Sequence, residues 1–210
     1  GPRINAGGRV GTPLDSLRVF LSEGERQLVH LEKLEALNTE RKKLQDSAVK
    51  IAEKMVDPMK NFLIAMSEDF HEGVLGIVAG RIAEKFQKPT LVAAQDGDKI
   101  VGSLRGPKYF HIVEMLDSVG DLLERYGGHQ QAGGVTLRVE NREKFQERCE
   151  NFCGERIEEH HLEPVQAVDT VLLPTERSDE NLRSLNALAP RGVGNLEPIF
   201  VLENLEIVGI

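Results

Sequence analysis

At the centre of the sequence stands the motif Gly127-Gly128-His129-Gln130-Gln131-Ala132-Gly133-Gly134, with four glycines and one histidine in eight residues. Glycines let the backbone take positive φ and come close to a bound group, so peptide N–H groups and His129 can converge on a phosphate or another anion. The alternative is a plain glycine-rich turn that leads into the strand expected at residues 135–139. The motif alone does not decide between a polar ligand site and such a turn.

The segments on either side of this motif predict an α/β fold. Residues 61–66 and 90–94 are short apolar runs typical of buried strands, and residues 99–104 follow the second run after a hairpin-type turn at 95–98. An amphipathic helix is expected over 74–86, where Gly76 and Gly80 give one smooth side on which another backbone can pack. Further helices are expected around 111–123 and from Asn141. We therefore expect a sheet flanked by helices.

A long helix is predicted ahead of this sheet, over residues 22–57. Ser22-Glu23-Gly24-Glu25 has the pattern of a capping box, and Pro58 supplies the stop. The apolar stripe between them is narrow, and a helix of this length extends roughly 50 Å, longer than a small domain is wide. We interpret it as a connector between two domains. A coiled coil is the alternative, and the interruption of the stripe at Arg41 argues against it.

Composition limits the classes of protein that fit. The chain of 210 residues is 40% hydrophobic, carries a formal net charge of −8 and has no run of 18 apolar residues. Cys149 and Cys153 lie four apart on one face of an expected helix, which does not favour a disulfide, so reduced thiols and a cytoplasmic protein are expected. The acidic balance argues against nucleic-acid binding by bulk charge, although residues 74–140 are neutral, so a phosphate site there would need a few placed cations.

Two further groups of side chains suit phosphate contact. Residues 1–9 bring Arg3, Asn5 and Arg9 together with glycines in what we expect to be a loop, or alternatively a flexible end. Ser103 and Arg105 stand two apart at the end of an expected strand, so they point to the same side. The cluster at 158–161 is interpreted as a solvated helix end and not as a metal site. No metal ligand is assigned in the chain.

The residues beyond Glu163-Pro164 have a different pattern. A strand-like segment at 165–173, a short helix around 180–188 and apolar residues at 201–210 predict the beginning of a barrel or sandwich. The chain is interpreted as cut at both ends.

The order of the motifs carries a resemblance that no single motif carries. It consists of Gly1-Pro2-Arg3-Ile4-Asn5-Ala6-Gly7-Gly8-Arg9, a long helix, His71-x-Gly73-Val74-Leu75-Gly76-Ile77-Val78-Ala79-x-Arg81, Gly102-Ser103-x-Arg105, Gly127-Gly128-His129-x-x-Ala132-x-Gly134, and Leu188-Ala189-Pro190-x-Gly192-x-Gly194-Asn195-x-Glu197-Pro198-x-Phe200. In this order the sequence resembles the RecJ-like single-strand-specific DNA exonucleases of the DHH phosphoesterase superfamily, over nearly all of its length.

The resemblance implies a division of the chain. Residues 1–21 would be the end of the catalytic-lobe motif region, 22–57 the connector helix, 58–162 a DHHA1 domain, and 163–210 the truncated beginning of an OB-like barrel. The Asp-His-His triplet that names the superfamily does not occur in the sequence. By this resemblance the chain is a fragment that carries the substrate-binding lobe.

The resemblance also implies a function. The parent would be a 5′–3′ exonuclease that hydrolyses phosphodiester bonds of single-stranded DNA in repair and recombination, with Mn²⁺ or Mg²⁺ in the full-length enzyme and no cofactor in this fragment, which would be inactive alone. Its partners would be single-stranded DNA and a single-strand-binding protein, with no membrane, and the parent would be monomeric. The alternatives are a non-catalytic nucleic-acid-binding DHHA1 module and a small-oligoribonucleotide phosphoesterase.

The candidate site combines the polar groups above. His129 is the candidate catalytic residue, as a phosphate or transition-state contact. The candidate nucleic-acid contacts are Arg3, Asn5, Arg9, His71, Arg81, Ser103, Arg105, Gly127, Gly128 and His129.

Overall fold

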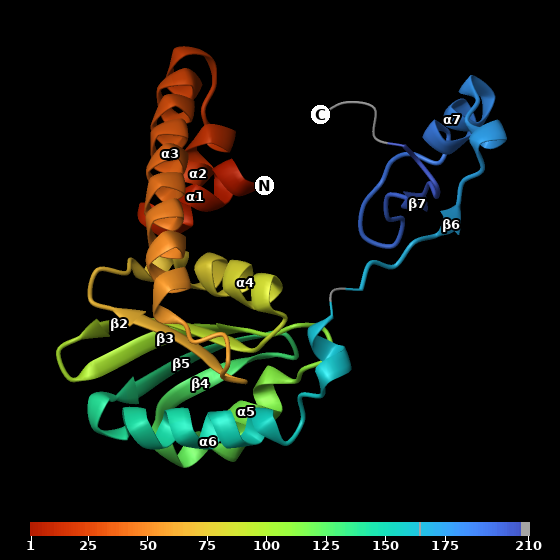
Figure 1. Ribbon diagram of the computed structural model, residues 1–210. Coiled ribbons are helices and arrows are strands. Elements are labelled where there is room, and N and C mark those ends of the chain that lie inside the picture. The colour runs from red at the N-terminus through yellow and green to blue at the C-terminus, as the bar shows by residue number, and fades with distance from the viewer. Residues whose placement is uncertain (164, 207–210) are drawn as a thin grey trace. The chain divides into compact units, whose positions relative to one another are not determined.

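The structure, a computed structural model, describes residues 1–163 and 165–206. The chain divides into two compact units, residues 1–163 and residues 164–210. The first unit joins a helical N-terminal part to a sheet domain (Figure 1). Over the described ranges, none of the helices is long and apolar enough to cross a membrane.

The sheet domain is built on five strands, in the order β1-β2-β3-β5-β4. Their bounds are β1 Leu63–Ser67, β2 Thr90–Asp96, β3 Lys99–Arg105, β4 Leu123–His129 and β5 Ala132–Arg138. β1 and β2 are parallel, because α4 (Leu75–Phe86) returns the chain between them. The other neighbours are antiparallel: β2–β3 and β4–β5 are hairpins, and β3 pairs with β5 across the intervening α5 and β4. The predicted α/β class with a helix-flanked sheet is confirmed.

Helices cover the two faces of this sheet unequally. α5 (Ile112–Ser118) and α6 (Arg142–Gly154) lie on one face, while α4 and the end of α3 lie on the other (Figure 1). Side chains of β2 alternate accordingly: Leu91 joins the core under α5 and α6, and Val92 joins the core under α3 and α4. On this second face α4 packs on β2 and β3, so β5 and the edge strand β4 extend beyond it.

The N-terminal part is three packed helices, which corrects the loop expected at residues 1–9. α1 (Pro2–Val10) and α2 (Pro13–Leu21) both pack against α3 (Gly24–Met55). Pro2 suits a helix start, because its fixed φ is helical and its missing N–H is not needed there. Gly7 serves a close helix contact, since a Cβ at this position would lie 2.4 Å from Ser16 Oγ. The glycines that suggested a loop therefore permit helix packing.

The long helix predicted from the sequence is confirmed as α3, with two corrections, and its role as a connector stays a prediction. It begins at Gly24, whose φ is +58°, and among the described residues it has no side-chain capping bond at its N-terminus, so the predicted capping box does not form. Arg41 does not interrupt the buried stripe but belongs to it, donating to Gln45 Oε1 at 2.7 Å and to Asn38 Oδ1 at 3.1 Å. The buried stripe of α3 consists of Leu34, Asn38, Arg41, Gln45, Ala48 and Ala52.

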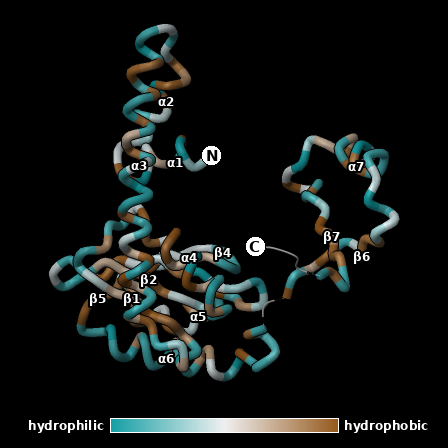
Figure 2. The backbone as a smooth tube through the Cα atoms, turned by 45° about the horizontal axis from the view of Figure 1, so that its top comes forward, coloured by the Kyte–Doolittle hydropathy of each residue, from teal (hydrophilic) through white to brown (hydrophobic). Residues whose placement is uncertain are grey.

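Hydropathy separates the two parts of the first unit. Hydrophobic residues gather in the strands and α4, whereas much of α3 is hydrophilic (Figure 2). Phe20, Leu21 and Leu28, at the turn between α2 and α3, are more than half exposed. The closed hydrophobic cores therefore lie in the sheet domain, including Phe145 and the free, buried Cys149 and Cys153 on α6.

The second unit contains little regular structure. It has a parallel pair of two-residue strands, β6 (Thr170–Val171) and β7 (Phe200–Val201), and one helix, α7 (Asp179–Asn186). None of its described residues, 165–206, is buried. The OB-like barrel remains a prediction, and the strand expected over 201–210 falls partly on 207–210, outside the described residues.

Short 3₁₀ turns in the two units are η1 (Glu72–Val74), η2 (Gly120–Leu122), η3 (Val139–Asn141), η4 (Glu159–Leu162) and η5 (Pro174–Glu176).

Candidate nucleic-acid interface

The glycine motif forms a hairpin, whose turn leads into a strand as the second interpretation of the motif expected. Gly127, Gly128 and His129 end β4, Gln130 and Gln131 form the turn, and Ala132 begins β5. The turn is tied down from outside, because Ile112 N donates to Gln130 O at 2.7 Å and Gly106 N donates to Gln131 O at 3.0 Å. Within the described residues, the glycines of this motif all have negative or extended φ. Positive φ is therefore not the reason for glycine here.

Two of these glycines are required by packing. A Cβ on Gly128 would lie 2.1 Å from the Ala132 carbonyl oxygen, and one on Gly133 would lie 2.9 Å from Leu116 Cδ1. Both positions point to the face that α5 and α6 cover, as does Gly102 on β3, where a Cβ would lie 2.5 Å from Leu91 Cδ1. Gly102 and Gly133 therefore leave no room for larger side chains on the covered face, whereas Gly128 is exposed and is required by the close backbone of the opposite strand.

The other two glycines have open space above them. A Cβ on Gly127 would meet none of the described atoms within 4 Å, and one on Gly134 would meet only the Gly102 carbonyl oxygen, at 4.0 Å. Gly127 and Gly134 are partners in the β4–β5 ladder, and Gly134 is in turn the partner of Ser103 on β3. They face the side of the sheet that carries α4 but lie beyond that helix.

Ser103 and Arg105 project from β3 toward α4, on the same side as their spacing predicted. A Cβ on Gly76 of α4 would lie 2.6 Å from Arg105 Nη2 and 3.6 Å from Ser103 Oγ. The smooth side of α4 thus receives the Arg105 side chain, and not a second backbone as we expected. Arg105 is half-buried, and its Nη1 donates to the Leu104 carbonyl oxygen at 2.7 Å.

Arg9 brings a second guanidinium to this place from α1. Its backbone touches Gly73, where a Cβ would lie 1.9 Å from the Arg9 carbonyl oxygen, and its Nη1 donates to Gly73 O at 3.1 Å. Burial lowers the pKa of Arg105, and the positive charge of Arg9 lowers it further. Among the described residues neither arginine has a carboxylate within 4.0 Å. We call Arg9, Ser103 and Arg105, beside Gly76, the arginine corner.

Other predicted contacts lie elsewhere. Arg3 forms an ion pair with Glu35 at 2.8 Å, and Arg81 forms one with Asp46 at 3.3 Å, so both side chains are directed to α3. His71 caps η1, because its Nδ1 accepts from Gly73 N at 3.0 Å. Asn5 is exposed on α1 and lines a surface pocket together with Arg9. The structure therefore does not bring Arg3, His71 or Arg81 into the arginine corner, and the DNA-binding roles of all four residues stay predictions.

His129 shares a face of the sheet with the arginine corner. Its ladder partner on β5 is Ala132, which is also the partner of Arg105, so the three residues lie in one row across β4, β5 and β3. Two strand spacings separate the backbones of His129 and Arg105 by roughly 10 Å. His129 is exposed. A ligand whose anionic group lies at the arginine corner would therefore contact His129 only if the rest of the ligand extends across β5.

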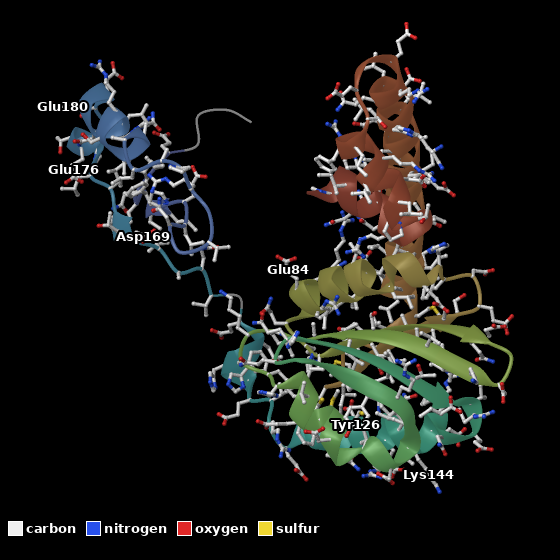
Figure 3. The ribbon with its side chains drawn as sticks, turned by 180° about the vertical axis from the view of Figure 1, so that it is seen from behind. Glu84, Tyr126, Lys144, Asp169, Glu176 and Glu180 are labelled. Atoms are coloured by element: carbon white, nitrogen blue, oxygen red, sulfur yellow. The ribbon has the colours of Figure 1, made fainter. Side chains whose placement is uncertain are left out.

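The open face of the sheet carries a trough that the sequence did not indicate. It has a volume of about 460 Å³, and the lining residues that face this side are Val101, Ser103, Arg125, Gly127, Gly134 and Thr136. Tyr126 contributes only backbone, because its ring points to the opposite side, against Gly120 (Figure 3). The signal for this trough in the sequence was the spacing of Arg125 and Gly127, which stand two residues apart and so share one face of a strand. The sequence could not indicate that both glycines face open space.

No metal centre is found in the described ranges, since they contain no group of three or more His, Cys, Asp or Glu side chains that could hold an ion. The residues present therefore do not fit a Mn²⁺ or Mg²⁺ site. At the end of the first unit, His160 contacts Glu158 at 3.4 Å. His161 is half-buried and stacks on Tyr109 at 4.3 Å, so this segment is not a fully solvated end as we expected. Burial raises the pKa of Tyr109 to about 12.

Comparisons with known proteins bear on these features. Residues 59–155 match the DHHA1 domain family. The chain is 29% identical to the single-stranded-DNA-specific exonuclease RecJ of Bacillus subtilis, over 97% of this chain and 27% of that protein. It is 32% identical to RecJ of Thermus thermophilus, over 96% of this chain and 29% of that protein.

A solved structure agrees with the sequence relatives. The crystal structure of Thermus thermophilus RecJ in complex with Mn²⁺ matches with a TM-score of 0.85 and 32% identity, covering 96% of this chain and 30% of that chain. The chain thus spans less than a third of the length of these relatives. Together these matches confirm the resemblance that the motifs indicated: residues 59–155 are a DHHA1 domain, and the chain belongs to the RecJ-like family of DHH phosphoesterases.

Proposed function

We propose that this chain is the substrate-binding lobe of a 5′–3′ single-stranded-DNA exonuclease, and that the arginine corner holds the 5′-phosphate of the strand. The names of the relatives supply the substrate class and the reaction. The chemistry of the corner supplies the phosphate.

The observation that carries the proposal is the placement of two guanidinium groups without counter-charge. Arg9 and Arg105 are close enough for one charge to lower the pKa of the other, and Arg105 is also half-buried. Like charges are held together at a cost unless an anion is bound between them. A phosphate group accepts charge-assisted hydrogen bonds from both guanidinium forks and from the Ser103 hydroxyl.

The corner also favours a strand end over an internal phosphate. A terminal phosphate carries up to two negative charges at neutral pH, which match two arginines, whereas an internal phosphodiester carries one. Gly76 supports this arrangement, because a side chain there would displace the Arg105 fork.

Binding of short oligonucleotides to the 210-residue chain tests the phosphate role. The native chain should prefer 5′-phosphorylated tetrathymidylate over the unphosphorylated tetramer by about tenfold to a hundredfold, the range of one or two charge-assisted hydrogen bonds. Arg105→Gln should abolish that preference. Arg142→Gln is the matched control, because Arg142 is exposed on α6, on the opposite face of the sheet. An undiminished preference in the Arg105 variant would contradict the proposal.

The remaining parts of the function are proposed in the same way. We propose that residues 22–57 connect the lobe to a catalytic lobe, that residues 163–210 begin an OB-like barrel, and that Mn²⁺ or Mg²⁺ serves the full-length enzyme. Two crystal structures of Thermus thermophilus RecJ are complexes with these ions. Because the described residues provide no metal ligands, we propose that this chain alone does not digest DNA. Metal-dependent digestion by the purified chain would contradict this.

For His129 we propose a contact to the phosphate that is transferred. In the full-length enzyme, His129→Ala should lower turnover by about two orders of magnitude, the scale of one lost, positioned donor. Because His129 is exposed, its removal should leave the melting temperature unchanged. A large fall in melting temperature would instead favour a role in tying down the hairpin.

A further inference from the structure

We infer that the trough on the open face of the sheet holds the nucleosides that follow the bound 5′-phosphate, with Arg125 contacting a phosphate further along the strand. This inference rests on the proposed function and extends it from a phosphate to a stretch of single-stranded DNA. Two glycines, Gly127 and Gly134, form the floor of the trough.

Gly127 and Gly134 are not explained by the folded protein itself. Both are exposed in the middle of a strand ladder, where glycine is unfavourable because it has no side chain to pack. Neither has positive φ, and neither has a described neighbour that a Cβ would displace. A protein that needed only a stable sheet would have β-branched residues here. Space kept free above two adjacent backbones suits a flat ligand that lies directly on the peptide groups.

The trough is continuous with the arginine corner. Ser103 belongs to both, because it lines the trough and lies beside Arg105 and Gly76. From Arg105 the floor continues for four residues along β3, roughly 13 Å, and for two strand spacings to β4, roughly 10 Å. A single DNA strand whose 5′-phosphate lies at the arginine corner would therefore contact Gly127 and Gly134 next. The trough has room there for one or two nucleosides.

Charge at the far side of the trough favours a phosphate. Arg125 on β4 is exposed and, within the described residues, has no carboxylate within 4.0 Å. The neighbouring charges at the end of the sheet are already matched, since Arg138 pairs with Asp98 and Glu124. Arg125 is therefore the cation of this region that is available to a ligand.

The edge of the sheet offers polar groups for the bases. β4 is an edge strand, so one row of its backbone N–H and C=O groups has no partner strand. Unpaired bases lying on the floor can donate to and accept from such groups, as well as from the Thr136 hydroxyl. Bases in a duplex are already paired and stacked, so this arrangement fits a single strand.

Amide chemical shifts of the 210-residue chain separate the two sites. Inorganic phosphate should shift amides of the arginine corner, at Gly76, Ser103 and Arg105. Tetrathymidylate with a 5′-phosphate should shift those amides and also Gly127, Gly134 and Arg125. A 5′-phosphorylated abasic tetramer should shift the corner and Arg125 but not the two glycines.

Each outcome of this titration decides one of the two ideas. Oligonucleotide shifts confined to the corner would overturn the trough inference and leave the proposed function intact. Shifts confined to the trough would support the inference and remove the terminal-phosphate role of the corner. Shifts at neither place would overturn both. Glycine shifts with the abasic tetramer would overturn the placement of bases on the floor.

Side-chain replacements give an independent test. Gly134→Val should raise the Kd of the phosphorylated tetramer about tenfold, leave the Kd of inorganic phosphate unchanged and not lower the melting temperature. Arg125→Gln should also weaken the tetramer, whereas Arg142→Gln should not. An unchanged Kd in both the Gly134 and Arg125 variants would overturn the inference.

Discussion

The two faces of the five-stranded sheet both contain glycines, and the glycines answer to different constraints. On the face covered by α5 and α6, Gly102, Gly128 and Gly133 are fixed by protein atoms less than 3 Å from where a Cβ would stand. On the face that α4 covers only in part, Gly127 and Gly134 stand in open space. The comparison teaches that a strand glycine can be required by the protein or kept free for a ligand. Replacing a glycine that the protein requires should lower the free energy of unfolding, whereas replacing a glycine in open space should not lower it.

The largest contrast concerns access to the covered face. Burial raises the pKa of Cys149 to about 12 and raises that of Cys153 as well, so both thiols stay protonated at pH 8. Their reaction with a thiol reagent should be at least about a thousandfold slower in the native chain than in urea, equivalent to about 4 kcal/mol. Thr136→Cys would add a thiol on the open face that reacts rapidly. Fast native labelling of Cys149 or Cys153 would break the contrast.

Filling the covered face should destabilise the chain next most strongly. Gly102→Val would force methyl groups against Leu91 and Ala93, whose atoms already lie 2.5 and 3.1 Å from the Cβ position. We expect a loss of about 3 kcal/mol in the free energy of unfolding, measured by urea denaturation, because overpacked cores relax only in part. Gly102→Ala should lose less. An unchanged urea midpoint would show that the core has unused space.

At the boundary of the two faces, one change should separate stability from binding. Gly76→Ala should stabilise α4 by about 0.5–1 kcal/mol, because alanine is the better helix former and the group in its way is the movable end of Arg105. The displaced guanidinium should then bind the 5′-phosphate about tenfold more weakly. Thermal melting and oligonucleotide titration measure the two effects. Loss of stability would mean that Arg105 cannot move aside.

The smallest effect is expected in the middle of the open face. Gly127→Ala should raise the free energy of unfolding by about 0.4–1 kcal/mol, since it restricts the unfolded chain and meets no described neighbour. The same substitution at Gly128, one residue along, should destabilise the hairpin, because the Ala132 carbonyl oxygen lies 2.1 Å from the Cβ position. Equal effects at the two positions would remove the distinction between the faces.

Much of the fold could be predicted from hydrophobic periodicity. The helix at 75–86, the hairpin of β2 and β3, and the helix at 142–154 all have clear periods and clear stops in the sequence. The hairpin at 123–138 could not be predicted, because four glycines replace the side chains that would reveal a strand period. The helix at 2–10 was missed for the same reason, since its glycines serve packing against α2.

The candidate site could be predicted only where spacing along one strand sufficed. Ser103 and Arg105 share a side by the period of a strand, and the structure places them accordingly. The partner of Arg81 could not be predicted, because Asp46 lies 35 residues away on another element. Gly127 and Gly128 are neighbouring glycines that the sequence cannot distinguish, and they differ in the free space around the position of an added Cβ. That difference depends on which face α5 and α6 cover.

The long helix α3 has a mechanical consequence. It ends on the sheet at Ala48 and Ala52, two small side chains that allow close contact without interlocking. Its 32 residues extend about 48 Å. A pivot of about 10° at this base would therefore move the opposite end, about 40 Å away, by about 7 Å. Small adjustments where α3 and α4 meet, within reach of the Arg81–Asp46 contact, would be amplified by this lever arm into displacements as large as a nucleotide.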